Sequence, residues 1–298
     1  MWQARSMRAM LFALASTAML RADDAAEMIQ RVSEEAAAFA RVAPEVLGRE
    51  TLKQRALKAP PRFHPRIGKT TSAPSDNWQT REIISEYGFA ALSSDPEGLH
   101  ELRQVTTVDG KKVRDSKDAE DALARALKAS DDERKIQALK QLEKYGLRGA
   151  ATDFGQLILL FSSRGMERYE FTAKGPRNVN GVPLLVFSYK QIDGSETLTL
   201  VDPKEGGTRH LRLEGEIWVL AGPKIPIRIT LVTSQGIGVE AVREQAAVDY
   251  AMSDYGSLLP VATLHQELRN GQMTVENRFM YSNFHKFGAS SSVTFGRP

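Results

Sequence analysis

The most informative absence in this 298-residue sequence is cysteine, of which there is none. Without cysteine the chain forms no disulfide, no thiolate nucleophile, no iron–sulfur cluster and no cysteine-ligated zinc site. It also lacks the residue that would carry the lipid of a lipoprotein. Small secreted eukaryotic domains are usually held together by disulfides, so a cysteine-free exported chain of this size is more typical of a bacterial periplasm.

Without its first 22 residues, the chain has no excess of charge of either sign. The whole chain has 40 Lys and Arg against 37 Asp and Glu, and its isoelectric point is about 9.0. Arg5, Arg8 and Arg21 all lie in residues 1–22, which contain no carboxylate. The rest of the chain is therefore neutral and has no basic excess with which to bind nucleic acid.

Long apolar runs are also absent. No stretch reaches the roughly 18 apolar residues that span a membrane, and the segment from Ala9 to Leu20 is too short. Basic residues precede that segment and small residues follow it, which predicts a signal peptide over residues 1–22, cleaved after Ala22 or alternatively after Ala18. The competing interpretation is a buried N-terminal helix. We expect a periplasmic or secreted protein without a transmembrane segment.

Motifs of catalysis and metal binding are missing as well. No two histidines lie within five residues of each other, so HExxH and similar metal spacings do not occur. The chain has no G-x-S-x-G elbow, no P-loop and no G-x-G-x-x-G. We expect no metal, no cofactor and no catalytic residue. The histidines are His64, His100, His210, His265 and His285.

Three polar features could still carry chemistry. His265 would face Glu276 across a hairpin, an arrangement that can tune proton transfer, but an exposed cross-strand pair is the favoured interpretation. Glu214 and Glu216 lie on one strand face about 6.5–7 Å apart, a separation that glycosidases use, although any solvent-facing strand produces it. Trp218 could stack on a sugar or a lipid headgroup, but a partly buried structural tryptophan is favoured.

We expect a single domain over residues 23–298 that begins with a helix at residues 23–43. Apolar residues recur there at steps of three and four, and Pro44 marks the end of the helix. The periodicity of residues 46–57 is ambiguous and does not decide the element type. Four prolines within residues 58–76 predict a loop. The apolar stripe of the helix consists of Ile29, Val32, Ala36, Phe39 and Ala43.

Residues 116–161 are predicted to be mostly helical. Ser130 and Glu133 have the spacing of a capping box, and Asp153–Phe161 is apolar on nearly all sides, as in a helix buried on both faces.

Residues 166–287 are predicted to form a β-meander. Turn chemistry occurs at Asp109-Gly110, Asp193-Gly194 and Asn270-Gly271. A two-residue turn at the last of these places Leu268 opposite Met273, Gln266 opposite Val275, Leu264 opposite Asn277 and Ala262 opposite Phe279. A turn at Asp193-Gly194 places Phe187 and Tyr189 beside Leu198 and Leu200. Each hairpin then has one mostly apolar face and one polar face.

An antiparallel sheet with one apolar face, together with helices that cover it, is an α+β architecture. The chain carries Gly215-x-x-Trp218 on one strand, Pro226-x-Arg228 on the next and Tyr281-Ser-Asn-Phe284 on the last. In these motifs and in the order of elements over residues 25–287 it resembles the LolA/LolB-like superfamily of periplasmic lipoprotein carriers. The resemblance implies a curved antiparallel β-sheet, or half-barrel, with helices that cover its apolar concave face.

Three hypotheses about function remain open. The first is a non-catalytic binder of an apolar or lipid-like ligand between sheet and helices; the second is an envelope protein that contacts another protein; the third is an exported hydrolase with an unrecognised site. An open apolar cavity would favour the first and a filled one the second. The candidate lining residues of the first are Phe187, Tyr189, Leu213, Ile217, Ile229, Leu264 and Phe279.

Overall fold

The computed structural model describes residues 25–58, 77–149, 153–193, 200–201, 208–209, 212–235 and 241–287. The predicted signal peptide and nearly all of the predicted proline-rich loop lie outside these residues, as do Gly194 and Leu198.

The chain begins with a helix over residues 25–42, followed by the 3-10 turn η1 (Ala43–Glu45). Met28, Val32, Ala36 and Phe39 recur along one side of the helix and are fully buried. The helix ends before Pro44, whose missing N–H and fixed φ angle do not continue it. The predicted helix is therefore confirmed over its described part.

Within the described residues, eleven strands form one sheet in the order β4-β3-β2-β1-β13-β12-β11-β10-β9-β6-β5, and each pairing is antiparallel. Residues 46–57, which had no clear period, form β1. A short separate pair consists of β7 (Leu200–Val201) and β8 (Thr208–Arg209). The strands of the large sheet are β1 (Val46–Leu57), β2 (Trp78–Leu92), β3 (Asp95–Val108), β4 (Lys111–Lys112), β5 (Tyr169–Val179), β6 (Val182–Gln191), β9 (Glu214–Leu220), β10 (Pro226–Gln235), β11 (Val242–Met252), β12 (Leu258–Arg269) and β13 (Gln272–Lys286).

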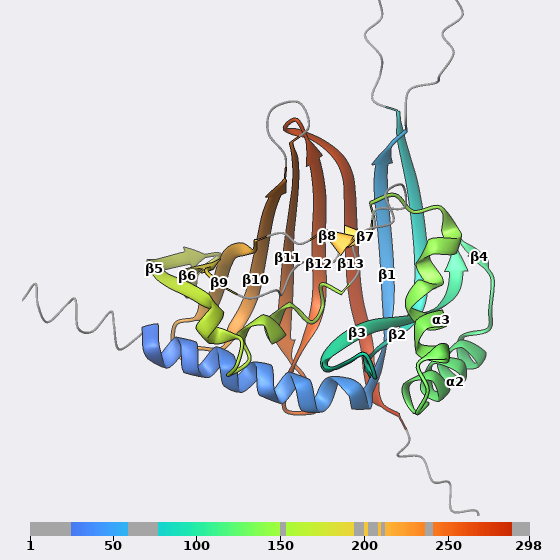
Figure 1. Cartoon of the computed structure of the whole chain (residues 1–298), viewed down its shortest axis with the longest axis horizontal. Coiled ribbons are helices and arrows are strands. Elements are labelled where there is room, and N and C mark those ends of the chain that lie inside the picture. Colours follow the sequence, from blue (N-terminus) through green and yellow to red (C-terminus); the bar gives the residue numbers. More distant parts are fainter. Residues whose placement is uncertain are drawn as a thin grey trace, which may run out of the picture.

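The sheet is curved and open, and the N-terminal helix crosses its concave face from the β5–β6 end toward β1 (Figure 1). The 3-10 segment η3 (Leu157–Phe161) lies on the same side. Aromatic and aliphatic residues of the inner strand faces, the helix and η3 form one hydrophobic cluster. This arrangement confirms the predicted α+β class with a curved antiparallel sheet.

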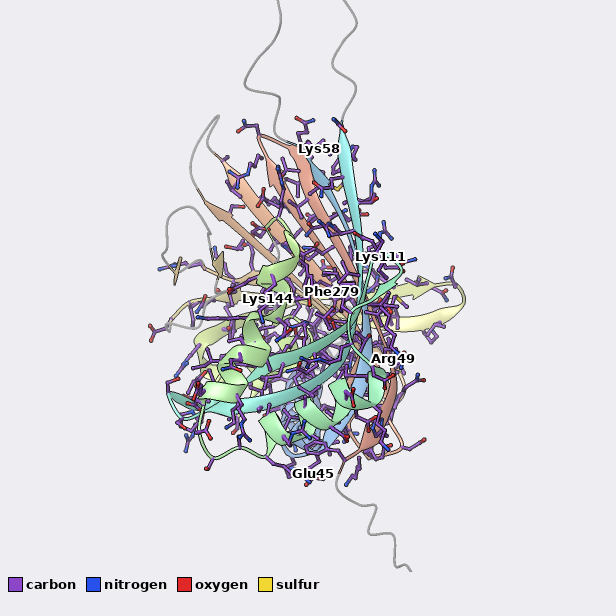
Figure 2. The ribbon with its side chains drawn as sticks, turned by 90° about the vertical axis from the view of Figure 1, so that its right-hand side faces the viewer. Glu45, Arg49, Lys58, Lys111, Lys144 and Phe279 are labelled. Atoms are coloured by element: carbon purple, nitrogen blue, oxygen red, sulfur yellow. The ribbon has the colours of Figure 1, made fainter. Side chains whose placement is uncertain are left out.

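Two further helices pack on the opposite, convex face. Helix α2 (Ser116–Leu127) and helix α3 (Glu133–Leu139) form a second hydrophobic cluster with β1, β2 and β3. A side chain at Gly88, on the strand face opposite Tyr87 and Phe89, would lie 3.1 Å from Leu127. Figure 2 turns this end of the sheet toward the viewer. The resemblance implied that the helices cover the concave face. Helices α2 and α3 lie on the convex face instead.

The capping box predicted at Ser130 and Glu133 does not form. Helix α3 begins at Glu133 with Asp132 as its N-cap, and no side chain caps it. The Asp132 carboxylate instead accepts a hydrogen bond from the backbone N–H of Ser93. The helix was therefore located correctly but its start was assigned to the wrong residue. The 3-10 segments η2 (Lys140–Tyr145) and η4 (Met166–Arg168) complete the helical elements.

The hairpin at Asn270-Gly271 confirms the predicted turn but not the predicted register. Both residues have positive φ angles, 53° and 78°, and Leu268 pairs with Met273. A bulge follows, because β13 contributes one residue more than β12 at Thr274. Beyond it Glu267 pairs with Val275, so the predicted pairs further along the hairpin are wrong. Gln266 now lies opposite Glu276, Leu264 opposite Arg278 and Ala262 opposite Met280.

The turns on either side of β6 also differ from the prediction. The hairpin partner of β6 is β5, through a turn at Asn180-Gly181 with φ angles of 52° and 84°. On its other side β6 pairs with β9, which places Phe187 opposite Ile217. Leu200 pairs with Arg209 instead of β6. The turn at Asp109-Gly110 is confirmed and joins β3 to β4.

Candidate functional site

Six of the seven apolar residues predicted to line a ligand site lie together on the concave face. Each exposes at most 3% of its surface, and all belong to the same hydrophobic cluster. Such small exposures mean that protein atoms surround these side chains, so the face is filled in this conformation. The six residues are Phe187, Tyr189, Leu213, Ile217, Ile229 and Phe279.

Leu264 lies apart from the other six. The bulge at Thr274 shifts the register of β12, so Leu264 shares the convex face with Ala247 and Arg278 and is only half-buried. Thr263 and His265 take the inward positions instead, and both are buried. Near the middle of the hairpin, β13 therefore contributes Phe279 to the apolar face, whereas β12 contributes the polar side chains of Thr263 and His265.

The N-terminal helix covers the apolar face through apolar contact. Its inward side is the buried stripe that ends at Phe39, whose ring meets the edge of Phe89 with 5.2 Å between centroids. Glu27 of this helix also forms an ion pair with Lys224, which lies in the turn between β9 and β10. Hydrophobic contact is non-directional, so the helix is held by area more than by specific bonds.

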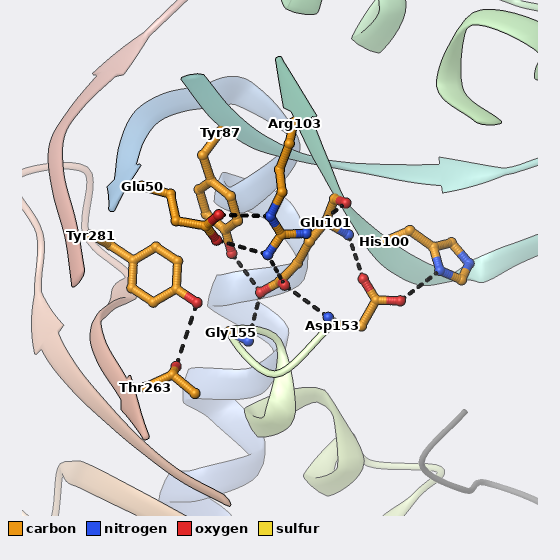
Figure 3. A network of polar contacts seen from close by, with 9 residues as sticks. All are labelled: Glu50, Tyr87, His100, Glu101, Arg103, Asp153, Gly155, Thr263 and Tyr281. Carbon is orange, nitrogen blue, oxygen red and sulfur yellow. Dashed lines mark hydrogen bonds and ion pairs between the residues drawn. The ribbon is translucent and has the colours of Figure 1, made fainter. Parts of the chain in front are cut away.

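The segment at residues 153–158 is attached to the sheet in a different way, through Glu101 of β3. The buried Glu101 carboxylate accepts hydrogen bonds from the backbone N–H groups of Asp153 at 2.8 Å and Gly155 at 2.7 Å (Figure 3). The Asp153 carboxylate in turn accepts the backbone N–H of Glu101 at 2.8 Å. The hydroxyl of Tyr250 adds a bond to the carbonyl of Gly155 and accepts one from the N–H of Ile158. Directional bonds therefore fix this segment.

Arg103 supports the Glu101 carboxylate from within the sheet. Its fully buried guanidinium donates to both carboxylate oxygens of Glu50, at 2.8 and 2.7 Å, and to Glu101 at 2.6 Å (Figure 3). Burial raises the pKa of Glu50, and the charge of Arg103 opposes that shift. Burial would lower the pKa of Arg103, but Glu50 and Glu101 hold it well above its ordinary value. The Tyr87 hydroxyl also donates to Glu101, at 2.6 Å.

A second polar cluster lies around His265, contrary to the predicted exposed pair with Glu276. His265 is fully buried, and its Nε2 lies 2.7 Å from a carboxylate oxygen of Glu244. Its Nδ1 lies 3.1 Å from the side-chain nitrogen of Asn277, and the ring of Phe154 stacks on it at 4.9 Å. Burial raises the pKa of Glu244. The register shift explains the error, because it turns His265 inward and leaves Glu276 on the convex face.

Neither cluster has the properties of a catalytic centre. Arg103, Glu50, Glu101 and His265 expose at most 1% of their surface, so a substrate cannot reach them in this conformation. Their hydrogen bonds join the strands to each other and to the covering segment. In the part of the chain that the structure describes, no three acidic or histidine side chains are grouped so as to hold a metal ion. No described helix is long and apolar enough to cross a membrane.

Glu214, Glu216 and Trp218 lie on the convex face, as the alternation of β9 predicts. The indole N–H of Trp218 donates to Glu216 at 2.9 Å. The guanidinium groups of Arg177 and Arg228 lie 5.1 and 5.8 Å from the ring centroid of Trp218. The prediction of a partly buried structural tryptophan is confirmed.

No family model matches the chain, and no curated protein matches its sequence. Solved structures of low identity are similar in fold. A DUF1329 family protein from Desulfovibrio piger has 10% identity and a TM-score of 0.36, with 90% of this chain and 97% of that chain covered. A LolA superfamily protein from Nitrosomonas europaea has 9% identity and a TM-score of 0.33, with 90% and 97% covered. A proposed outer membrane lipoprotein-sorting protein domain from Vibrio parahaemolyticus has 10% identity and a TM-score of 0.35, with 88% and 93% covered.

The distant resemblance to LolA-like proteins expected from the sequence is thus found again among solved structures, as a likeness of fold. At such identities and TM-scores it carries no inference about ligand or activity.

Proposed function

We propose that this chain is an exported, non-catalytic binding protein of the bacterial envelope, with one domain over residues 23–298, that holds an apolar, lipid-like ligand on its concave face. The observation that carries the proposal is the difference between the two parts of the cover. The segment at residues 153–158 is fixed by directional bonds to Glu101 and Tyr250. The N-terminal helix is held mainly by apolar contact. An acyl chain offers the same kind of contact and can take the place of the helix.

The free energy lost when the helix leaves the sheet and the free energy gained when an acyl chain takes its place are similar in size. A fully buried Val, Met or Phe side chain contributes about 1.5–3 kcal/mol, and each buried CH₂ of an acyl chain contributes ~0.8 kcal/mol. A long acyl chain therefore offsets the loss of the helix stripe. Because the face is filled when the helix is in place, ligand affinity depends on how often the helix lifts from the sheet.

Titration of a fluorescent single-chain fatty acid into the full chain tests the proposal. Val32→Ala removes two methyl groups from the helix stripe, which weakens the closed state by about 1.6 kcal/mol. We expect the apparent affinity for the probe to rise by about tenfold. Gln30→Ala, on the exposed side of the same helix, is the matched control and leaves the affinity unchanged.

A second variant acts on the sheet. Ile229→Trp adds a large uncharged ring to the face, where it occupies the space that the ligand takes once the helix has lifted. We expect it to weaken probe binding while circular dichroism shows a folded protein. If the parent and Val32→Ala both fail to bind the fatty acid, or if a folded Ile229→Trp binds as the parent does, the concave face is not a lipid site.

The filled concave face favours a second candidate, an interaction module that contacts another envelope protein through a sheet edge or the N-terminal helix. Neither contact requires the helix to leave the sheet. Under this hypothesis Val32→Ala lowers stability without creating an affinity for the fatty acid.

A further inference from the structure

The convex face carries a polar groove of about 550 Å³ at the end of the sheet away from α2 and α3. It lies over β5, β6, β9 and β10, four neighbouring strands. Its volume is within the range of small-molecule sites. The groove is on the opposite side of the sheet from the N-terminal helix, so its role does not depend on the apolar ligand proposed above.

The strand register arranges the groove as two rows of side chains that run across the strands. In the first row Thr172 of β5, Ser188 of β6 and Glu216 of β9 are neighbours. The second row runs parallel to it two residues away, about 6.5–7 Å along the strands. It consists of Glu170, Lys190 and Glu214.

A close approach of β9 and β10 fixes the floor of the groove. A side chain at Gly215 would lie 2.0 Å from the carbonyl oxygen of Thr230, so only glycine fits there. The Thr230 hydroxyl accepts the backbone N–H of Glu216 at 2.9 Å, and the Tyr189 hydroxyl donates to the Thr230 carbonyl at 2.7 Å. These bonds hold the first row in place from below.

Among the described residues, four charged groups of the groove form no ion pair, namely Glu170, Lys174, Lys190 and Glu214, whereas Glu216 pairs with Arg177 at 3.6 Å. Arg228 pairs with Asp249, and Arg278 pairs with Glu276. Within the described chain, by contrast, no ion pair is formed by Lys190, although it lies between two glutamates in its row, nor by Lys174 at the rim. The charged groups of Glu170, Lys174, Lys190 and Glu214 thus remain free to bond to a ligand, whereas the Ser188 hydroxyl already donates to the carbonyl of Thr172 at 3.3 Å.

Acidic and basic side chains alternate in the groove, and this alternation selects the chemistry of the ligand. An anion would meet Glu170, Glu214 and Glu216, and a cation would meet Lys174 and Lys190. A hydroxyl group both donates and accepts hydrogen bonds, so a polyhydroxylated ligand can bond to the carboxylates, ammonium groups and hydroxyls together. We propose that this groove binds a neutral glycan. Trp218 takes no part, because Arg177 and Arg228 already lie over its ring.

Titration of the isotopically labelled full chain with tetra-N-acetylchitotetraose and with maltotetraose, followed by NMR, tests the proposal. At least one of these oligosaccharides is expected to shift the amide signals of Thr172, Ser188 and Glu216. The double variant Thr172→Ala/Ser188→Ala removes two partly exposed hydroxyls and is expected to weaken that binding by about fivefold or more. Thr51→Ala removes a half-buried threonine of β1 outside the groove and leaves the binding unchanged.

Spermidine and inorganic phosphate serve as charged probes in the same titration. The proposal is overturned if neither oligosaccharide shifts the groove signals, or if the double variant binds as tightly as the parent. It is also overturned if spermidine or phosphate shifts the same signals as strongly as the oligosaccharides, since the groove would then select charge.

Discussion

Arg103 is the largest fully buried side chain among the described residues. A buried guanidinium is tolerated only when carboxylates and hydrogen bonds replace the water that it loses. Here Glu50 and Glu101 supply both, and Glu101 uses its remaining hydrogen-bonding capacity to hold the backbone of the covering segment. One charge cluster thus joins β1 and β3 to a segment on the other side of the core.

Removal of Arg103 should therefore be costly. Arg103→Ala leaves two buried carboxylates without their cation, and we expect the free energy of unfolding to fall by about 3–5 kcal/mol. Lys53→Ala breaks an exposed pair with Glu82 and should change the free energy of unfolding by less than about 1 kcal/mol. Urea unfolding followed by circular dichroism measures both. Equal effects of the two substitutions would show that the buried cluster has no special role in stability.

The buried polar residues could not be predicted from the sequence. Polar residues that alternate with apolar ones, as Glu101 and Arg103 flank Leu102, normally mark a strand face in contact with water. The same alternation arises when a polar face is covered and its groups bond to each other. Tertiary partners distinguish these cases, and some of them lie far away in the sequence, such as Gly155 for Glu101 and Gln54 for Asn277.

At the scale of elements, His100 links β3 to the covering segment. Its Nδ1 lies 3.4 Å from the carboxylate of Asp153, and its Nε2 lies 3.5 Å from that of Asp95. The hydrogen bond to Asp153 raises the pKa of His100, burial opposes the shift, and the charges of Asp153 and Asp95 add to it. The folded protein therefore favours the protonated imidazole.

The sign of the pH dependence follows from this shift. A raised pKa in the folded state means that the contribution of His100 is complete below the unfolded value of about 6.5 and is lost as pH rises through the folded value. We expect the amides of Gly155 and Ile158 to be better protected from hydrogen exchange at mildly acidic than at alkaline pH, after correction for intrinsic exchange rates. His100→Gln should remove this difference. Equal protection at both pH values in the parent would contradict the prediction.

The turns and the register show where sequence patterns succeed and where they fail. Asp109-Gly110 and Asn270-Gly271 are turns because Asn or Asp followed by Gly tolerates positive φ at both positions. Asn180-Gly181 carries the same signal and was overlooked in favour of Asp193-Gly194. The bulge at Thr274 has no comparable signature, since one additional residue leaves the alternation of each strand intact. That bulge alone decides that Leu264 faces outward and His265 inward.

At the scale of the whole molecule, the curved sheet and the helix across it were predictable because they depend on many residues together. The alternation of β9 and β10 and the spacing of the N-terminal stripe each place apolar side chains on one face. The degree to which that face is filled was not predictable, because it depends on how the helix and η3 pack. The position of α2 and α3 on the convex face was not predictable either. It depends on Gly88, because the absence of a side chain there leaves space for Leu127.

The prediction at the scale of the whole molecule is that the chain is exported. Residues 1–30 fused to a reporter that is active only in the periplasm should give activity, because the apolar segment and its basic flank are predicted to act as a signal peptide. Deletion of residues 9–20 from the fusion should abolish the activity. Sequencing of the processed protein should find an N-terminus near Asp23. A full-length chain that remains in the cytoplasm would contradict both the export and the envelope function.

The position of β1 in the middle of the sheet affects when the protein can fold. Its neighbours are β2 and β13, the second and the last strands of the large sheet, and Leu52 pairs with Phe279 near the other end of the sequence. Contacts between residues so distant in sequence form slowly. The two halves of the sheet cannot join until the C-terminal strand is available, so a chain that crosses a membrane N-terminus first completes its core only after nearly all of it has emerged.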